Sequence, residues 1–148
     1  MSMPPRTEPV FVPPQGPPGM EDRPSPELYA AMGEAAIFRM LEDLYEELGR
    51  SGIRAMFPAD LREASKRSAA FFVSVMGGPP LYQQRYGSPM MRRRHLPFRI
   101  DEAARAEWLA CFGRVLERSQ EKYGLPPQHL PGFRRFLESF SAWMVNAK

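Results

Sequence analysis

Apolar side chains recur at the spacing of an α-helix over most of the chain, and this periodicity constrains the fold more than any other feature. Ile37, Leu41, Leu44 and Leu48 follow one another at intervals of four, three and four residues. That spacing places them on one face of a helix. No segment alternates apolar and polar residues as a half-buried strand does. The sequence therefore predicts an all-α protein.

Capping residues, glycines and prolines divide this pattern into separate helices. We expect helices over about residues 26–32, 34–48, 61–76, 89–96, 102–123 and 133–144. Asp60 and Asp101 stand where N-caps are needed, and Glu63 completes a capping box with Asp60. The third helix is expected to turn these residues inward: Leu61, Ala64, Ser68, Phe71, Phe72 and Val75.

The first 26 residues differ from the rest because nine of the seventeen prolines lie there, at positions 4, 5, 9, 13, 14, 17, 18, 24 and 26. Proline fixes φ and lacks an N–H, so residues 1–26 are expected to form an extended or disordered arm. Residues 27–148 then form one domain. The short apolar island Val10-Phe11-Val12 leaves docking of the arm open as an alternative to a solvated tail.

Composition excludes several classes of protein. A chain of 148 residues with 43% hydrophobic and 25% charged residues has the content of an ordinary globular domain. It contains no apolar run of about 18 residues and no signal-peptide pattern, which predicts a cytoplasmic protein without a membrane span. A single cysteine, Cys111, excludes an internal disulfide and a cysteine-rich zinc site. The net charge of +3 is weak evidence for nucleic acid as a partner.

His95 is the candidate metal ligand, in the segment MMRRRHLPF at residues 90–98. An ordinary hydrogen-bonded histidine is the alternative. Leu96, Phe98 and Ile100 follow it and suit an apolar cofactor pocket. No cysteine cluster or Glu-x-x-His pair accompanies it, so zinc and di-iron sites are poorly supported. One imidazole is what a haem iron requires of a protein, since the porphyrin supplies four nitrogens.

The arginines before His95, residues 92–94, have two interpretations. They form a solvated cationic surface, or they bind the carboxylates at the edge of a haem. Consecutive helical residues point in different directions, and Arg94 is the better candidate for the second role. Binding of nucleic acid would need more basic residues on one face and interleaved aromatics, and the acidic residues that follow disfavour it.

Tyr45 and Trp108 carry polar groups on apolar helix faces. Each is either a core aromatic whose O–H or N–H finds a backbone carbonyl, or a donor in a haem pocket. In the second case the two groups would donate hydrogen bonds to iron-bound oxygen, each contributing about 1 to 3 kcal/mol.

Several segments together carry a family resemblance. They are GGPPLYQQRYGSPMMRRRHLPFRI, DEAARAEWLACF, LEDLYEEL and the Phe57-Pro58 corner. From about Glu34 to Asn146 the chain resembles the truncated haemoglobins of group II, preceded by a proline-rich N-terminal extension. The resemblance implies a two-over-two helical sandwich around haem b, with His95 as the proximal metal ligand and Tyr45 and Trp108 as the distal donors.

The resemblance also implies the other residues that contact the haem. Phe57 would pack on the porphyrin at the inter-helix corner, Phe71 and Phe98 on the ring, and Arg67, Tyr82 and Arg94 would hold the propionates. Many group II members have tyrosine at the Phe57 position, so one phenolic donor is missing here. Ala64 stands at the place of the distal histidine of other globins. Ser68 is smaller than usual, which leaves room for a water.

Three hypotheses about function follow. The first is a haem protein that binds O₂, NO, CO, peroxide or cyanide at a His-ligated iron and releases its ligand slowly. The second is a redox enzyme, a nitric oxide dioxygenase or a peroxidase-like protein, which needs a separate reductase because no nucleotide-binding Gly-x-Gly-x-x-Gly turn is present. The third is a haem-free helical interaction module. Formation of a homodimer is left open.

Overall fold

The structure is a computed structural model that describes residues 8–148. Its elements are the 3-10 turns η1 (Met20–Asp22), η2 (Arg54–Met56) and η3 (Pro127–His129), and the helices α1 (Leu28–Met32), α2 (Glu34–Gly49), α3 (Leu61–Val75), α4 (Leu81–Tyr86), α5 (Met91–His95), α6 (Glu102–Leu116), α7 (Ser119–Tyr123) and α8 (Leu130–Met144). No strand occurs within residues 8–148. The prediction of an all-α protein is confirmed.

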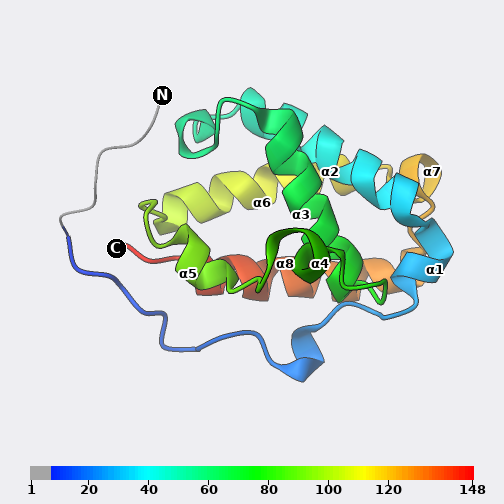
Figure 1. The fold of residues 1–148 in the computed structure, drawn as a ribbon, viewed down its shortest axis with the longest axis horizontal. Coiled ribbons are helices and arrows are strands. Elements are labelled where there is room, and N and C mark those ends of the chain that lie inside the picture. Colours follow the sequence, from blue (N-terminus) through cyan, green and yellow to red (C-terminus); the bar gives the residue numbers. More distant parts are fainter. Residues whose placement is uncertain (1–7) are drawn as a thin grey trace.

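The four long helices form two contacting pairs, α2 with α3 and α6 with α8, and α2 also contacts α6 (Figure 1). A cluster of phenylalanines joins three of these helices. The ring centroid of Phe72 lies 5.6 Å from that of Phe112 and 6.0 Å from that of Phe133. All three rings are buried. Burial of side chains of this size contributes about 1.5–3 kcal/mol each, so the cluster is a main source of the free energy of folding.

The predicted N-caps are present. A side-chain oxygen of Asp60 accepts a hydrogen bond from the Glu63 N–H at 3.1 Å, at the start of α3. Asp101 accepts one from the Ala104 N–H at 2.8 Å, at the start of α6. Each cap satisfies a backbone donor that the first turn of a helix leaves unpaired. The starts of these two helices were therefore correctly located from sequence.

Three helix assignments were wrong. The helix α4 was not predicted at all. The helix expected over residues 102–123 is two helices, because Arg118 leaves the helical region with φ −124° and ψ 37° between α6 and α7. The turn expected from Pro126 to Gly132 is shorter, since α8 already begins at Leu130. Pro131 lies in the first turn of α8, where proline is tolerated because its missing N–H would have had no partner.

The inward face of α3 was only partly right. Of the six residues predicted to face inward, Phe72 alone is fully buried, and Ala64, Ser68 and Phe71 are half-buried. Ala69 and Val73, each one residue after a position predicted to face inward, are fully buried. The helix packs on α2 with one face and lines a cavity with the adjacent face, and a single apolar stripe in the sequence does not separate the two.

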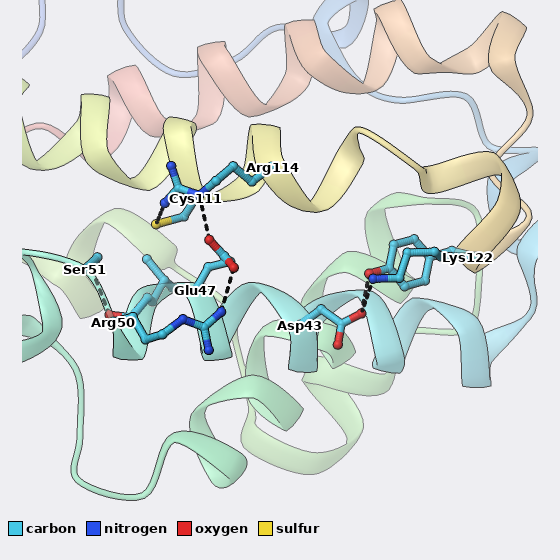
Figure 2. Close-up of polar contacts among 9 residues, drawn as sticks. Asp43, Glu47, Arg50, Ser51, Cys111, Arg114 and Lys122 are labelled. Carbon is cyan, nitrogen blue, oxygen red and sulfur yellow. Dashed lines mark hydrogen bonds and ion pairs between the residues drawn. The ribbon is translucent and has the colours of Figure 1, made fainter.

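Polar contacts at Asp43 and Glu47 fasten α2 to α6 and α7 (Figure 2). The Arg114 guanidinium of α6 donates to the Glu47 carboxylate at 2.6 Å, and Arg50 donates to the same carboxylate at 2.7 Å. These two donors lower the pKa of Glu47. One turn earlier, Asp43 accepts a hydrogen bond from the Tyr123 hydroxyl of α7. Tyr45 is thus on a segment of α2 that is held at both ends.

The arm runs outside the helices and passes beneath α8 (Figure 1). Between residues 8 and 26 its only helical element is η1, which lies against α8. Val10 and Val12 are exposed, whereas Phe11 is half-buried and packs against Ile100, Met144 and their neighbours. In the described part of the chain, no helix is both long and apolar enough to span a bilayer.

Candidate functional site

A cavity of about 640 Å³ lies between α2, α3, α5, α6 and α8. Its volume is in the range of about 300–1,000 Å³ that is typical of ligand and cofactor sites. All nine residues of the site predicted from sequence line this cavity: Tyr45, Phe57, Arg67, Phe71, Tyr82, Arg94, His95, Phe98 and Trp108. The structure therefore brings together residues that are spread over five helices and two loops.

His95 is the last residue of α5 and is half-buried at the cavity. Its Nδ1 lies 2.6 Å from the carbonyl oxygen of Met91. A carbonyl oxygen only accepts, so Nδ1 carries the proton and Nε2 keeps a free lone pair. Burial lowers the pKa of His95, which favours the neutral ring. A neutral imidazole oriented through its other nitrogen is the form in which histidine binds a metal.

Tyr45 brings a phenolic hydroxyl to the cavity from α2. Its Oη lies 2.7 Å from the Ser68 Oγ of α3, and either oxygen can be the donor. Burial raises the pKa of Tyr45, so the phenol keeps its proton in neutral solution. The Phe57 ring meets the Tyr45 ring edge-on at 5.6 Å and restricts its movement. Tyr45 thus has a polar partner, Ser68, within the protein itself.

Trp108 brings an indole N–H to the same cavity from α6. Within residues 8–148 this N–H has no hydrogen-bond partner, and Trp108 is half-buried. A tryptophan in such a place normally finds an acceptor. Its ring is held by Phe112 and Phe140, with centroids at 5.3 Å and 6.4 Å. A fixed donor without an acceptor, at the wall of a cavity, is suited to bind a ligand with an electron-rich atom.

Aromatic and aliphatic side chains make up most of the remaining wall. Phe71 packs on Phe140 at 5.3 Å and on Tyr82 at 6.4 Å. Ile100, which sequence placed in an apolar pocket, lines the cavity. Sequence reasoning missed other residues that line it: Ile53, Met56, Met91, Ala104, Arg105, Phe140 and Met144. Phe140 and Met144 share one face of the last helix, and that periodicity was a usable signal. Ile53 and Met56 lie in or near a loop, where no periodicity indicates direction.

Arg67 and Arg94 are the exposed cations of the cavity wall. Arg67 lies 3.9 Å from Glu63 and stacks over the Tyr86 ring at 4.5 Å. Arg94 donates through Nε and Nη2 to three backbone carbonyls, those of residues 86, 88 and 89. No carboxylate of the described residues forms an ion pair with Arg94. Both side chains thus remain able to attract an acidic ligand edge.

The residues of this cavity fit a haem. A flat porphyrin needs apolar walls, one neutral imidazole for its iron, and cations near its propionates. The cavity has apolar walls, one neutral imidazole and exposed cations, and the Trp108 N–H, which has no partner within residues 8–148, would add a donor for a bound ligand. The fit rests on the donor set and on the orphaned N–H of Trp108 rather than on volume alone.

Comparisons with known proteins agree with the fold and with this cavity. The family model of the bacterial-like globins matches residues 27–140. The group 2 truncated hemoglobin YjbI of Bacillus subtilis (strain 168) is 37% identical over 90 residues, which are 60% of this chain and 68% of that protein.

Solved structures of globins are also similar. The crystal structure of phosphate-bound Hell's gate globin IV gives a TM-score of 0.78 at 39% identity and covers 92% of this chain and 81% of that one. The truncated oxygen-avid haemoglobin of Bacillus subtilis gives 0.69 at 30% identity, over 82% of this chain and 99% of that one.

The fold and the matches define the class: an all-helical globin of the truncated type. The chain belongs to the bacterial-like globin family, as a group II truncated haemoglobin. The two-over-two fold is confirmed, and the cofactor of the family is haem b. Binding of small gas ligands such as O₂ is the general function of this family.

Proposed function

We propose that this protein binds haem b with His95 as the metal ligand and holds O₂ and related diatomic molecules beside Tyr45 and Trp108. The observation that carries the proposal is the Nδ1 contact of His95 with the Met91 carbonyl at 2.6 Å, at the wall of an apolar cavity. That hydrogen bond fixes the tautomer and leaves Nε2 for the iron. Haem supplies the iron on which a diatomic ligand binds reversibly.

The remaining residues have distinct parts in the proposal. Phe57, Phe71 and Phe98 contact the porphyrin and exclude water from it. Arg67 and Arg94 would pair with the propionates through their guanidinium groups, and the Tyr82 hydroxyl would donate a hydrogen bond to them. The Tyr45 hydroxyl and the Trp108 N–H donate hydrogen bonds to the diatomic ligand. Both donors act in a cavity of low dielectric, where such bonds are stronger than in water.

Two hydrogen-bond donors on one bound O₂ molecule slow its release. The phenol of Tyr45 is kept protonated by burial, and the indole of Trp108 has no partner to give up within the described residues. At about 1–3 kcal/mol, the bond from Trp108 slows ligand release by about tenfold to a hundredfold, and the bond from Tyr45 slows it less because that hydroxyl gives up its contact with Ser68. A related haemoglobin, that of Bacillus subtilis, is described as oxygen-avid. We therefore propose slow release of O₂.

The test of the proposal is the visible spectrum of the haem-loaded protein and of its His95→Gly variant. We expect the parent protein to give the spectrum of an imidazole-ligated haem, and the variant to lose it and regain it with added imidazole. His129→Gly is the matched control, because His129 contacts Glu27 and lies outside the cavity wall. A His95→Gly variant with an unchanged spectrum would refute the assignment of the metal ligand.

A redox activity is a second candidate, favoured by the convergence of two donors on one cavity. Nitric oxide dioxygenation and peroxide reduction both benefit from hydrogen bonds that polarise an O–O bond. Either reaction would need a separate reductase as partner. Steady-state consumption of NO with a purified reductant separates such turnover from simple binding.

A further inference from the structure

Helix α5 carries His95 but is too short to hold its own position. It has five residues, Met91–His95, and a helix of this length does not form alone in water. Met90, the N-cap residue before it, has φ 34°, a backbone conformation that residues other than glycine rarely adopt. The placement of His95 must therefore come from contacts outside α5.

Arg92, on this helix, supplies three such contacts. Its guanidinium donates to the carbonyl oxygens of Phe11 at 2.8 Å and of Val145 at 2.9 Å, and it also donates to that of Trp143. It stacks over the Trp143 ring at 4.6 Å. One side chain thus joins α5 to the N-terminal arm and to the C-terminal segment. These parts lie at one end of the molecule (Figure 1).

Asn146 fastens the other side of the same region. Its Nδ2 donates to the carbonyl oxygens of His95 at 3.2 Å and of Phe98 at 2.9 Å, and its Oδ1 accepts from the Ile100 N–H at 2.9 Å. Asn146 is fully buried. A buried amide with satisfied donors and acceptor specifies one arrangement of the chain around it. The backbone that follows His95 is therefore fixed by the C-terminal segment.

The arm completes this arrangement. The Phe11 N–H donates to the Asn146 carbonyl oxygen at 2.9 Å, while the Phe11 carbonyl accepts from Arg92. Glu8 pairs with Arg99 at 2.5 Å on the loop after α5. We name residues 8–11, Arg92 and residues 143–146 the proximal clasp. Its members come from three distant parts of the sequence and meet beside the histidine helix.

We propose that Arg92 is a positioning residue for His95, and that the proximal clasp sets how firmly α5 presents the imidazole to the cavity. The inference rests on the proposed function for its haem readouts, but the clasp itself is testable without haem. A guanidinium is needed because three carbonyls in different directions require its fork of N–H donors, which the ammonium of lysine does not reproduce. The arm then has a function in the site although it does not line the cavity.

The experiment compares Arg92→Gln and Arg92→Lys with Arg93→Gln in the full chain. Arg93 is on the same helix and exposed, and its side chain forms no hydrogen bond, ion pair or ring contact within residues 8–148, so it is the matched control. Hydrogen exchange of residues 91–98 is measured in the haem-free and haem-loaded protein. Haem transfer to an acceptor globin and the iron–histidine stretching frequency of the ferrous protein are measured as well.

We expect Arg92→Gln to raise hydrogen exchange in residues 91–98 and haem transfer by about tenfold, the effect of losing one or two charge-assisted hydrogen bonds. The iron–histidine frequency should also shift. Arg92→Lys should change each of the three measurements in the same direction but by less than Arg92→Gln. Arg93→Gln should match the parent protein. Equal behaviour of Arg92→Gln and Arg93→Gln in all three measurements would overturn the inference.

A second pair of variants keeps the inference testable if Arg92→Gln does not fold. Phe11→Ala should raise exchange in residues 91–98, and Val12→Ala, at an exposed neighbour, should not. Unchanged exchange in Phe11→Ala would remove the arm from the clasp. If the His95→Gly spectrum refutes the metal ligand, the exchange of the haem-free protein still decides whether the clasp holds α5, so the two failures are distinguishable.

Discussion

Replacing Trp108 with Phe is the sharpest test of the cavity chemistry. The substitution removes the indole N–H but keeps an aromatic ring against Phe112 and Phe140, whose centroids lie 5.3 Å and 6.4 Å from that of Trp108. Because the N–H has no partner within residues 8–148, it gains a hydrogen bond to a bound ligand without losing one to the protein. Its full contribution should therefore appear in the ligand-bound state.

The expected change in O₂ dissociation follows from this gain of one hydrogen bond without the loss of another. A hydrogen bond to a ligand atom with partial negative charge is worth about 1.5–3 kcal/mol, so O₂ dissociation should accelerate by at least about tenfold. The association rate should change little, since the entry of a diatomic molecule does not depend on this donor. Stability should fall only slightly, because the ring contacts are mostly retained.

The assay is stopped-flow measurement of O₂ dissociation from the ferrous protein, with O₂ replaced by CO. Tyr29→Phe is the control, since it also removes a polar group from an aromatic side chain, and Tyr29 contacts Glu34 and does not line the cavity. Its dissociation rate should stay close to that of the parent protein. An unchanged rate in Trp108→Phe would refute the reasoning, because it would mean that the indole does not contact the ligand.

Three further predictions concern single groups. Tyr45→Phe should accelerate O₂ dissociation by about threefold, less than Trp108→Phe, because the Tyr45 hydroxyl must give up its 2.7 Å contact with Ser68 to bind the ligand. The same stopped-flow assay checks this order of the two variants, and the reverse order would contradict it. Ser68→Ala should raise O₂ affinity by roughly threefold, because the buried Tyr45 phenol then lacks its Ser68 partner in the ligand-free protein. A lower O₂ affinity in an equilibrium titration would disprove this prediction. Asp101→Ala should lower the free energy of unfolding by about 1 kcal/mol through loss of the α6 cap. The hydrogen bond from the Ala104 N–H lowers the pKa of Asp101 in the folded protein, so this stabilisation is complete above the unfolded pKa and is lost as pH falls through the folded pKa. Denaturant titrations at neutral and strongly acid pH should therefore show a difference between variant and parent only at the higher pH.

The helices that sequence located well have their own local signals. Asp60 and Asp101 cap α3 and α6 with side-chain hydrogen bonds, and a capping residue is visible in sequence. Helix α4 has six residues and no side-chain cap, which is too short for a periodic pattern. The break between α6 and α7 contains neither glycine nor proline. A tertiary contact accompanies it, the hydrogen bond from Tyr123 of α7 to Asp43 of α2.

The candidate site was predictable where residue type alone restricts the chemistry. His95, Tyr45 and Trp108 stood out because each combines a polar group with an apolar helix face, and all three line the cavity. The family resemblance added Phe57 and Arg67, which no periodicity would have selected. What sequence did not indicate is the partner of each polar group. The Tyr45 contact with Ser68 joins residues 23 positions apart, and only the packing of α2 on α3 creates it.

The three arginines before His95 show the limit of reading a charge run as one feature. Arg93 is exposed, Arg94 lines the cavity and binds the carbonyls of the preceding loop, and Arg92 turns the other way to the arm and the C-terminal segment. Successive helical residues are about 100° apart, so three adjacent side chains reach three different surroundings. Sequence favoured Arg94 for the haem edge on that ground but had no basis for giving Arg92 a partner 81 residues away. Because that partner is in the proline-rich arm, a segment whose composition suggests independence from the domain is placed where it can influence the position of His95.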